Sequence, residues 1–410
     1  MRFFSKALVV SSFLVSGFLI SSNAQERPPF LDKQTDWVDS VFSTLDLDAK
    51  VGQLFMVAAY SNRDEAHKLE ILELVEQYKI GGLIFFQGGP VRQANLHNAY
   101  QAKADVPLLV AMDCEWGVGM RLDSTIRYPY QMALGAIRNN ELIYDMGEEV
   151  ASQFKRLGMH VNFAPVIDVN NNAKNPVINF RSFGEDKYNV TTKGSAYMRG
   201  MQDHGILACG KHFPGHGDTD VDSHKDLPVI LHDRTRLNDI ELYPFHELMR
   251  EGLGSVMVAH LSIPVLDPTN NLPSTLSSPI IKKLLKDSLG FEGMVFTDAL
   301  NMEGVAKYYA PGEVDLKAYQ AGNDVLLFSL NVKKGIELIK RAVDEEEITE
   351  EEIDASVKKM LHLKYWAGLD KERYVKLAGL TEDLNHVQAQ LLNRKLVEAS
   401  LTVIRNEEEI

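Results

Sequence analysis

The sequence predicts an α/β fold, a (β/α)8 TIM-type barrel with a C-terminal helical tail and a strand-like end. Eight short apolar runs alternate with longer amphipathic segments of helical length between residues 52 and 329. Several runs end on or beside an ionisable residue, as strands do where they converge on the mouth of a barrel enzyme. The chain has 410 residues, of which 45% are hydrophobic, so it can bury a core of this size.

The elements are expected in a simple order along the chain. An amphipathic helix opens it around 37–45. The apolar runs that predict strands are 52–59, 82–86, 108–113, 161–169, 206–212, 255–260, 294–298 and 324–329. Residues 354–369 have the pattern of a closing helix and 381–399 that of another. Residues 400–404 alternate like a strand, which would need a sheet to join.

An open doubly wound sheet is the alternative arrangement of these elements. Such sheets usually carry a glycine fingerprint for a dinucleotide, and the glycine pairs at 81–82 and 88–89 lack its spacing. Eight strand signals at helix-sized intervals favour the barrel. In a barrel, the polar residues at the strand ends would meet at one mouth, and these are Asp113, Asp168, His212, His260 and Asp298.

The first 24 residues have the order of a secretory signal peptide. Arg2 and Lys6 precede an apolar stretch at 7–20, and small residues lie before Gln25. The apolar stretch is shorter than a membrane span needs. We therefore expect export to the periplasm or the extracellular space, with a retained N-terminal anchor as the alternative. The catalytic barrel is expected over 25–370, and 371–410 as a C-terminal helix and a linker towards a further domain.

Composition narrows the classes of partner. The formal net charge is −14, and removal of residues 1–24, which hold two basic residues and no acidic one, would make it −16. A surface this acidic argues against nucleic acid or anionic lipid as a partner. The two cysteines, Cys114 and Cys209, lie in or beside predicted strand ends. We expect two buried thiols rather than a disulfide or a metal pair.

Residues 211–224 are the most chemically informative stretch, Lys-His-Phe-Pro-Gly-His-Gly-Asp-Thr-Asp-Val-Asp-Ser-His. Pro214, Gly215 and Gly217 exclude a helix or a strand interior, so this stretch is a polar loop. It follows the apolar run 206–210 directly. The ionisable groups therefore lie at the end of a buried strand, where α/β enzymes keep their chemistry.

A metal site is the alternative interpretation of this loop. Its side chains include types that zinc or calcium accepts, namely His212, His216, Asp218, Asp220, Asp222 and His224. Pro214 and Gly215 exclude the helical turn of a His-Glu-x-x-His zinc site, and the loop lacks the glycine and the distal glutamate of a calcium loop. We therefore expect no metal and no other cofactor.

Six motifs, taken in order, resemble glycoside hydrolase family 3, specifically its β-N-acetylglucosaminidase branch, over residues 45–369. They are Lys-Val-Gly-Gln-Leu at 50–54, Asp-Cys-Glu at 113–115 with Arg121, Asn-Phe-Ala-Pro-Val-Ile-Asp-Val at 162–169, Arg-Ser-Phe-Gly at 181–184, the loop 211–224, and Phe-Thr-Asp-Ala-Leu-Asn-Met at 296–302. The resemblance implies a retaining exo-glycosidase, with an aspartate nucleophile after the seventh strand and an aspartate–histidine acid/base pair on the fifth loop.

The chemistry of the residues agrees with these roles. Asp298 follows an apolar run at 293–297, so a buried strand would hold a carboxylate at the mouth; the alternative is a cap for the next helix near Asn301 or Glu303. His224 can give and take a proton near neutral pH, and Asp222 could fix its tautomer. Spacing alone also allows a solvated loop histidine, and the resemblance favours catalysis.

The resemblance also implies the residues that bind the terminal sugar, which are Asp113, Arg121, Arg181, Lys211 and His212. Two alternatives remain at this point. Lys211 and His212 could pair with the buried Asp168, and Arg181 could brace its own loop through Glu185 or Asp186. The chain departs from the family at Trp116, where glycine is expected, so we expect a bulkier rim beside Asp113.

The leading functional hypothesis is hydrolysis of terminal non-reducing β-N-acetylglucosamine from peptidoglycan fragments or chitooligosaccharides. Phosphorolysis on the same scaffold is the second hypothesis, because a neutral histidine donor repels an incoming phosphate less than a glutamate would. A broader β-glucosidase is a third. A fourth hypothesis is that the protein is not an enzyme but a sugar-binding module with inactive loops. The presence of both Asp298 and His224 argues against it.

Overall fold

The computed structural model describes residues 25–31, 35–223 and 226–405. The predicted signal peptide at 1–24 and the proposed acid/base residue His224 lie outside the described residues. Within the described ranges, no helix is both long enough and apolar enough to cross a membrane.

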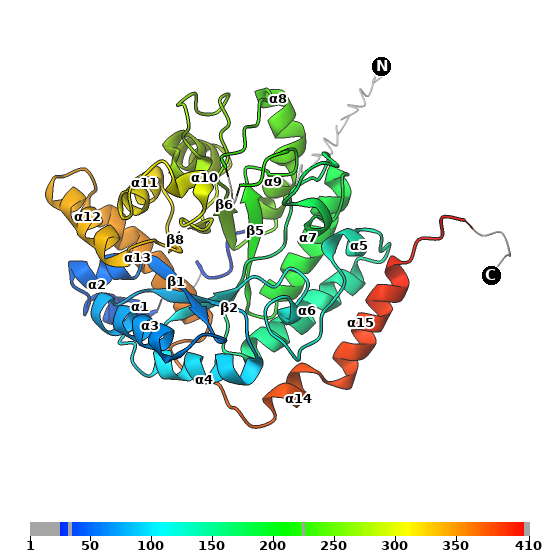
Figure 1. Ribbon diagram of the computed structural model, residues 1–410, viewed down its shortest axis with the longest axis horizontal. Coiled ribbons are helices and arrows are strands. Elements are labelled where there is room, and N and C mark those ends of the chain that lie inside the picture. The colour runs from blue at the N-terminus through cyan, green and yellow to red at the C-terminus, as the bar shows by residue number, and fades with distance from the viewer. Residues whose placement is uncertain (1–24, 32–34, 224–225, 406–410) are drawn as a thin grey trace, which may run out of the picture.

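Eight parallel strands form a barrel (Figure 1). They are β1 (Phe55–Tyr60), β2 (Gly82–Phe86), β3 (Leu109–Met112), β4 (Val161–Asn162), β5 (Leu207–Phe213), β6 (Ser255–Val258), β7 (Met294–Thr297) and β8 (Leu326–Leu327). Their hydrogen-bonded order is β7-β6-β5-β4-β3-β2-β1-β8, and a parallel bridge between Phe296 and Val325 joins the two ends of this order. The barrel prediction is confirmed, and the open doubly wound sheet is excluded.

The strand pleat separates two apolar cores. Met56 and Ile84 belong to a cluster that fills the barrel, whereas their neighbours Val57 and Leu83 pack in the cluster shared with the helices. Phe30 is fully buried in the inner cluster, so residues 25–31 contribute a side chain to the core of the barrel. Each strand therefore has apolar contacts on both faces, which explains the continuous apolar runs in the sequence.

Helices surround the barrel between the strands (Figure 1). The longer ones up to residue 366 are α3 (Glu65–Tyr78), α4 (Pro90–Gln101), α6 (Glu141–Arg156), α7 (Lys187–Gln202), α9 (Tyr243–Arg250), α11 (Glu313–Ala321), α12 (Val332–Asp344) and α13 (Glu350–Trp366). A π-helical segment, Pro279–Ser288, follows β6. The expected closing helix at 354–369 is α13, which starts earlier because Thr349 and Glu352 form a capping box.

Several element boundaries differ from the prediction. The opening helix is α1 (Asp36–Phe42), and residues up to Gly52 form a second short helix, α2 (Leu47–Gly52), so that β1 starts only at Phe55. The long run 161–169 contributes only two residues to β4. Pro165 lacks an N–H and cannot extend the ladder, which accounts for part of this shortening.

The C-terminal tail differs most from the prediction. The single helix expected at 381–399 is two helices, α14 (Leu380–Leu384) and α15 (Val387–Ser400). Asn385 donates its side-chain amide to the Thr381 carbonyl at 2.8 Å, and the His386 ring caps α15 by accepting the Ala389 N–H at 3.2 Å. Together these two residues end one helix and start the next.

The strand predicted at 400–404 is wrong. Ser400 ends α15, and residues 401–404 pair with no strand in the described part of the chain. Leu401 and Ile404 are 73% and 96% exposed. In a closed barrel every strand is already paired on both sides. Residues 401–404 therefore find no unpaired strand of the barrel with which to form a ladder.

Candidate active site

A cavity of about 330 Å³ opens at the carboxyl ends of the strands. This volume suits a single small-molecule site. Six of the eight predicted site residues line it together, namely Asp113, Arg121, Arg181, Lys211, His212 and Asp298. Asp222 is half-buried just outside the lining, and its neighbour Ser223 is part of the lining.

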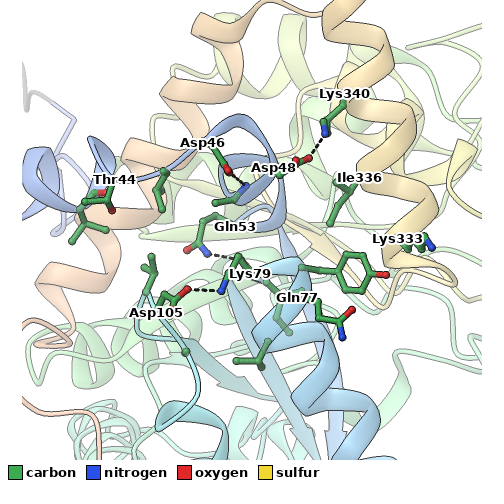
Figure 2. Close-up of a pocket in the computed structure, with 18 of the residues that line it drawn as sticks. Thr44, Asp46, Asp48, Gln53, Gln77, Lys79, Asp105, Lys333, Ile336 and Lys340 are labelled. Carbon is green, nitrogen blue, oxygen red and sulfur yellow. Dashed lines mark hydrogen bonds and ion pairs between the residues drawn. The ribbon is translucent and has the colours of Figure 1, made fainter.

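A larger cavity of about 1040 Å³ lies at the opposite end of the barrel (Figure 2). Its lining includes Gln53 and Ile80, which precede β1 and β2. Figure 2 shows paired charges in this cavity, such as Lys79 with Asp105. Because barrel enzymes place chemistry at the carboxyl ends of the strands, the smaller cavity is the candidate active site.

Asp298 follows β7 and is held at the cavity by its backbone. Its N–H donates to the Val258 carbonyl at 2.9 Å, and its Oδ1 accepts the Ala299 N–H at 2.8 Å. Burial alone would raise the pKa of this carboxyl, but His260, His212 and the Ala299 N–H lower it below its ordinary value. Asp298 is therefore an ionised carboxylate, as a nucleophile requires.

Lys211 joins two carboxylates at the end of β5. Its Nζ lies 2.7 Å from Asp113 Oδ1 and 2.9 Å from Glu115 Oε1, and Arg121 Nη2 lies 2.8 Å from the other oxygen of Asp113. Burial opposes charge on each group, yet the partners lower the pKa of Asp113 and raise that of Lys211. The cavity wall is thus a fixed array of full charges.

Arg181 extends this array towards β4. Its guanidinium makes a forked pair with Glu115, with Nη2 to Oε1 at 2.8 Å and Nε to Oε2 at 3.0 Å. Burial opposes its charge, but Arg181 and Lys211 hold the pKa of Glu115 well below its ordinary value. The alternative brace through Glu185 or Asp186 is wrong, because Asp186 instead caps α7 by accepting the Asn189 N–H.

His212 and Asp168 connect the array to the β5 loop. His212 Nδ1 lies 2.7 Å from Asp168 Oδ2, and its Nε2 faces Arg181 at 3.2 Å. Asp168 also accepts the His216 N–H at 2.6 Å. The alternative that Lys211 and His212 pair with Asp168 is confirmed for His212. It is wrong for Lys211, which pairs with Asp113 and Glu115. Asp168 therefore fixes both a cavity-lining imidazole and the start of the loop.

His216 organises the following turn. One ring nitrogen contacts the Thr219 hydroxyl at 2.9 Å and the other the Ser223 hydroxyl at 3.0 Å. Burial, with a contribution from His212, lowers the pKa of His216 to about 4, so the ring is neutral at physiological pH. From the sequence, no role was predicted for Glu115, and His216 was considered only as a possible metal ligand, although both residues lie inside the quoted motifs.

The described residue before position 224, Ser223, lies at the cavity, and the first described residue after it, Asp226, lies beside Gly304. Ser223 lines the cavity, and a methyl group placed on Gly304 would lie 2.7 Å from the Ser223 carbonyl and 3.1 Å from the Asp226 carbonyl. Gly304 belongs to α10 (Glu303–Ala306), in the segment that follows Asp298. The described residues that flank position 224 therefore lie against the β7 side of the cavity.

Trp116 does not form the bulkier cavity rim expected from its position. It is buried edge-to-face against Tyr130, with ring centroids 4.7 Å apart, and it is not among the residues that line the cavity. Cys114 and Cys209 are free and buried, as predicted. Burial raises the pKa of Cys209 to about 12, so this thiol is unreactive at neutral pH.

The closed parallel barrel and the charged cavity at its strand ends define the class of (β/α)8-barrel enzymes. Within this class, the chain belongs to glycosyl hydrolase family 3. The family model described as the glycosyl hydrolase family 3 N terminal domain matches residues 46–363.

Individual relatives agree with this membership. Beta-hexosaminidase A of Pseudoalteromonas piscicida is 31% identical over 82% of this chain and 61% of its own length. A Cellulomonas fimi protein named beta-N-acetylglucosaminidase/beta-glucosidase is 26% identical, and 66% of its length is covered. The chain thus spans less than two thirds of these two curated relatives.

A solved structure gives the same result. The glycoside hydrolase family 3 beta-N-acetylglucosaminidase from Paenibacillus sp. str. FPU-7 superimposes with a TM-score of 0.82 at 38% identity, covering 88% of this chain and 70% of that one. The predicted family is confirmed.

Proposed function

We propose that the protein is a retaining exo-glycosidase that hydrolyses terminal non-reducing β-N-acetylglucosamine residues. The observation that supports this most is the single cavity in which an ionised Asp298 lies with the charged array around Lys211. A carboxylate nucleophile and a set of groups that can bind ring hydroxyls are what a glycosidase subsite needs. The names of the relatives, which include beta-hexosaminidase and beta-N-acetylglucosaminidase, agree with this proposal.

The proposed reaction has two displacements. In the first, an Asp298 oxygen attacks the anomeric carbon, the bond to the leaving oxygen breaks, and His224 gives that oxygen its proton. In the second, His224 takes a proton from water, the water oxygen attacks the anomeric carbon, and the bond to Asp298 breaks. Asp222 is proposed to orient the imidazole and to stabilise its protonated form.

The charged array is proposed to bind the hydroxyl groups of the terminal sugar. The carboxylate of Asp113 accepts from hydroxyl groups, whereas Lys211 and Arg181 donate to them. Their mutual ion pairs hold these groups in place before substrate arrives. A sugar that lacks a matching hydroxyl would leave one of these groups unpaired, which is the physical basis of discrimination.

Peptidoglycan fragments and chitooligosaccharides are the proposed natural substrates, with the protein exported. Export predicts that the mature chain starts at Gln25, whose side-chain amide donates to the Gly290 carbonyl at 3.2 Å. Mass determination of protein from the periplasm or medium would check this. A chain that still carries residues 1–24 would support the retained anchor.

Substrate choice provides the first test. We expect nitrophenyl β-N-acetylglucosaminide to be hydrolysed with a much higher kcat/KM than nitrophenyl β-glucoside, and sugar product to retain the β configuration in its first-formed anomer. Equal rates on both glycosides would favour the broader β-glucosidase. If sugar 1-phosphate were the main product in phosphate buffer, the enzyme would be a phosphorylase.

His224→Ala should affect substrates according to their leaving group. Protonation of the leaving group matters only when the departing oxygen is basic. The kcat/KM for chitobiose, which reports the first displacement, should therefore fall about 100-fold or more, while the kcat/KM for an activated nitrophenyl substrate should fall far less. Steady-state kinetics on both substrates measure the difference. Equal losses would remove His224 from the acid role.

Gly304→Val should disturb the same step without touching the reacting groups. Its side chain would press on the Ser223 and Asp226 carbonyls, which flank position 224, and misplacement by about 1 Å can cost about 100-fold in rate. We expect chitobiose turnover to fall at least about tenfold, with less effect on the activated substrate. A variant that matches the wild type on chitobiose would show that this contact does not position the loop.

A further inference from the structure

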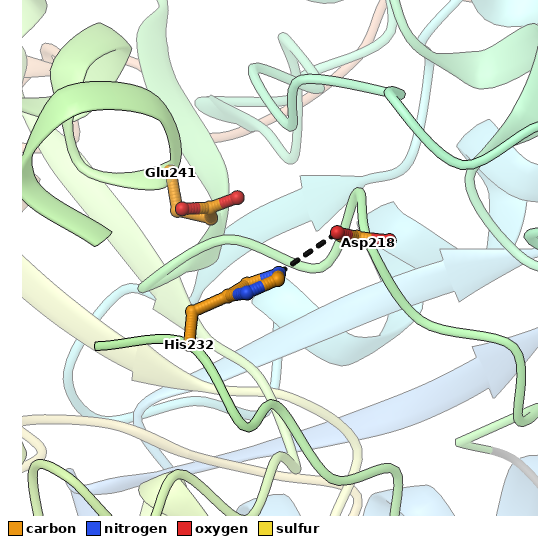
Figure 3. Close-up of side chains that lie close together, drawn as sticks. All are labelled: Asp218, His232 and Glu241. Atoms are coloured by element: carbon orange, nitrogen blue, oxygen red, sulfur yellow. Dashed lines mark hydrogen bonds and ion pairs between the residues drawn. The ribbon is translucent and has the colours of Figure 1, made fainter. Parts of the chain in front are cut away.

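Three side chains of metal-binding type meet outside the candidate active site (Figure 3). Asp218 lies in the loop after β5, whereas His232 and Glu241 lie in the segment that leads to α9. One ligand atom from each residue lies within 4.8 Å of the other two, and His232 Nε2 is 2.8 Å from Asp218 Oδ2. None of the three is among the residues that line the active-site cavity.

Glu241 lacks full compensation for its buried charge. Its side chain is 3% exposed, and its Oε1 accepts from Arg236 Nη2 at 3.1 Å. Its Oε2 is buried and has no hydrogen-bond partner among the residues that the structure describes. A buried carboxylate oxygen in this state is costly, and a cation is its natural partner.

We propose that Asp218, His232 and Glu241 bind one divalent transition-metal ion, of which Zn²⁺ is the best match. An imidazole and two carboxylates are ligands that zinc takes, with a water molecule completing four-fold coordination. The imidazole disfavours calcium and magnesium, which prefer all-oxygen sites. This set differs from the loop residues considered in the sequence, because His232 and Glu241 join Asp218 only in the fold.

The charge of Arg236 limits the affinity that we expect for the metal ion. Its Nη2 lies 3.6 Å from Asp218 Oδ2, beyond hydrogen-bond distance, and its side chain is 36% exposed, so it can swing towards solvent. Its positive charge opposes a second cation, so the affinity should be micromolar rather than nanomolar. Removing the charge should therefore tighten metal binding, which a purely structural ion-pair network would not do.

The site would join two ends of the loop that carries Asp222. Asp218 precedes that part of the chain, and His232 and Glu241 follow it. Gly215, at the start of the loop, already lies against Glu241, because a methyl group there would be 2.7 Å from the Glu241 Cβ. Bound zinc would therefore link the two ends of the loop. Because this link restrains the chain between them, zinc should protect residues 219–231 from proteolysis.

The test uses the full chain, stripped with a chelator and free of any affinity tag, titrated with Zn²⁺ by calorimetry. We expect one ion per chain for the wild type and at least about 100-fold weaker binding for Asp218→Asn, His232→Gln and Glu241→Gln. His204→Gln is the matched control, because His204 pairs with Glu148 at 3.2 Å without belonging to this group, and it should bind like the wild type. Thermal melts without metal establish that each variant is folded.

One further variant and one spectroscopic measurement keep the proposal falsifiable if a ligand variant fails to fold. Arg236→Gln should bind Zn²⁺ more tightly than the wild type, and Co²⁺ should give visible absorption bands that His232→Gln lacks. Absence of binding to the wild type would overturn the proposal. So would loss of binding in His224→Gln with retention in His232→Gln, which would make His224, and not His232, the ligand of the ion.

Discussion

Asp298→Asn is expected to lower kcat at least about 1,000-fold on an activated nitrophenyl substrate, because it replaces the carboxylate proposed as the nucleophile with a neutral amide of the same shape. The side-chain oxygen of asparagine can still accept the Ala299 N–H, so the fold should be kept. The wild-type carboxyl has a lowered pKa, so the nucleophile is ionised throughout the neutral range. Kinetics with a parallel melting curve separate lost chemistry from lost structure.

Asp267→Asn is the matched control for this variant. Asp267 is a buried aspartate of the same barrel that accepts from the Ser277 hydroxyl at 2.6 Å and lies outside the cavity lining. This change should lower the melting temperature and leave kcat near the wild-type value. If Asp298→Asn kept kcat within tenfold of the wild type, Asp298 would not be the nucleophile.

Glu115→Gln is expected to have the largest effect on stability. Glu115 is fully buried and holds both Arg181 and Lys211, so its neutral replacement leaves buried cations with too little negative charge. Breaking one partner of a buried ion pair typically costs about 3–5 kcal/mol of folding free energy. The same change should lower kcat/KM about 100-fold, because the groups proposed to read the sugar lose their positions. Denaturant unfolding and steady-state kinetics measure the two effects.

The sign of the pH dependence follows from the depressed pKa of Glu115. The stabilisation is complete above the ordinary glutamate range and is lost progressively as the pH falls from that range towards the lower, folded-state value. The gap between wild type and variant should therefore begin to narrow once the pH falls below the ordinary pKa of glutamate. Glu292→Gln, which breaks an exposed pair with Arg27, should cost less than about 1 kcal/mol. Equal losses for the two variants would show that the buried array does not stabilise the barrel.

The sequence predicted the parts of the molecule that depend on local pattern. Apolar runs located all eight strands, and the polar residue after a run located Asp113, His212 and Asp298 at the cavity. The sequence did not predict which residues from distant segments pair with one another. Arg181 lies close to Glu185 in sequence, yet it pairs with Glu115, 66 positions away, because the β3 and β4 ends adjoin in the barrel.

The errors have the same physical origin. An alternating pattern at 400–404 indicates a strand only if an edge is available, and the barrel leaves none there. The cluster of Asp218, His232 and Glu241 has no regular spacing and appears only when the β5 loop folds back. The predicted rim at Trp116 was wrong for the same reason, because the indole packs against Tyr130 and away from the cavity.

The most direct test of the central claim is to trap the glycosyl-enzyme. With His224→Ala and an activated nitrophenyl N-acetylglucosaminide, the first displacement needs little protonation while the second lacks its base, so a covalent intermediate should accumulate. The expected result is a burst of nitrophenol and a mass increase of one N-acetylglucosaminyl group on the peptide that contains Asp298. A linear time course without an adduct, or an adduct on another residue, would contradict the account.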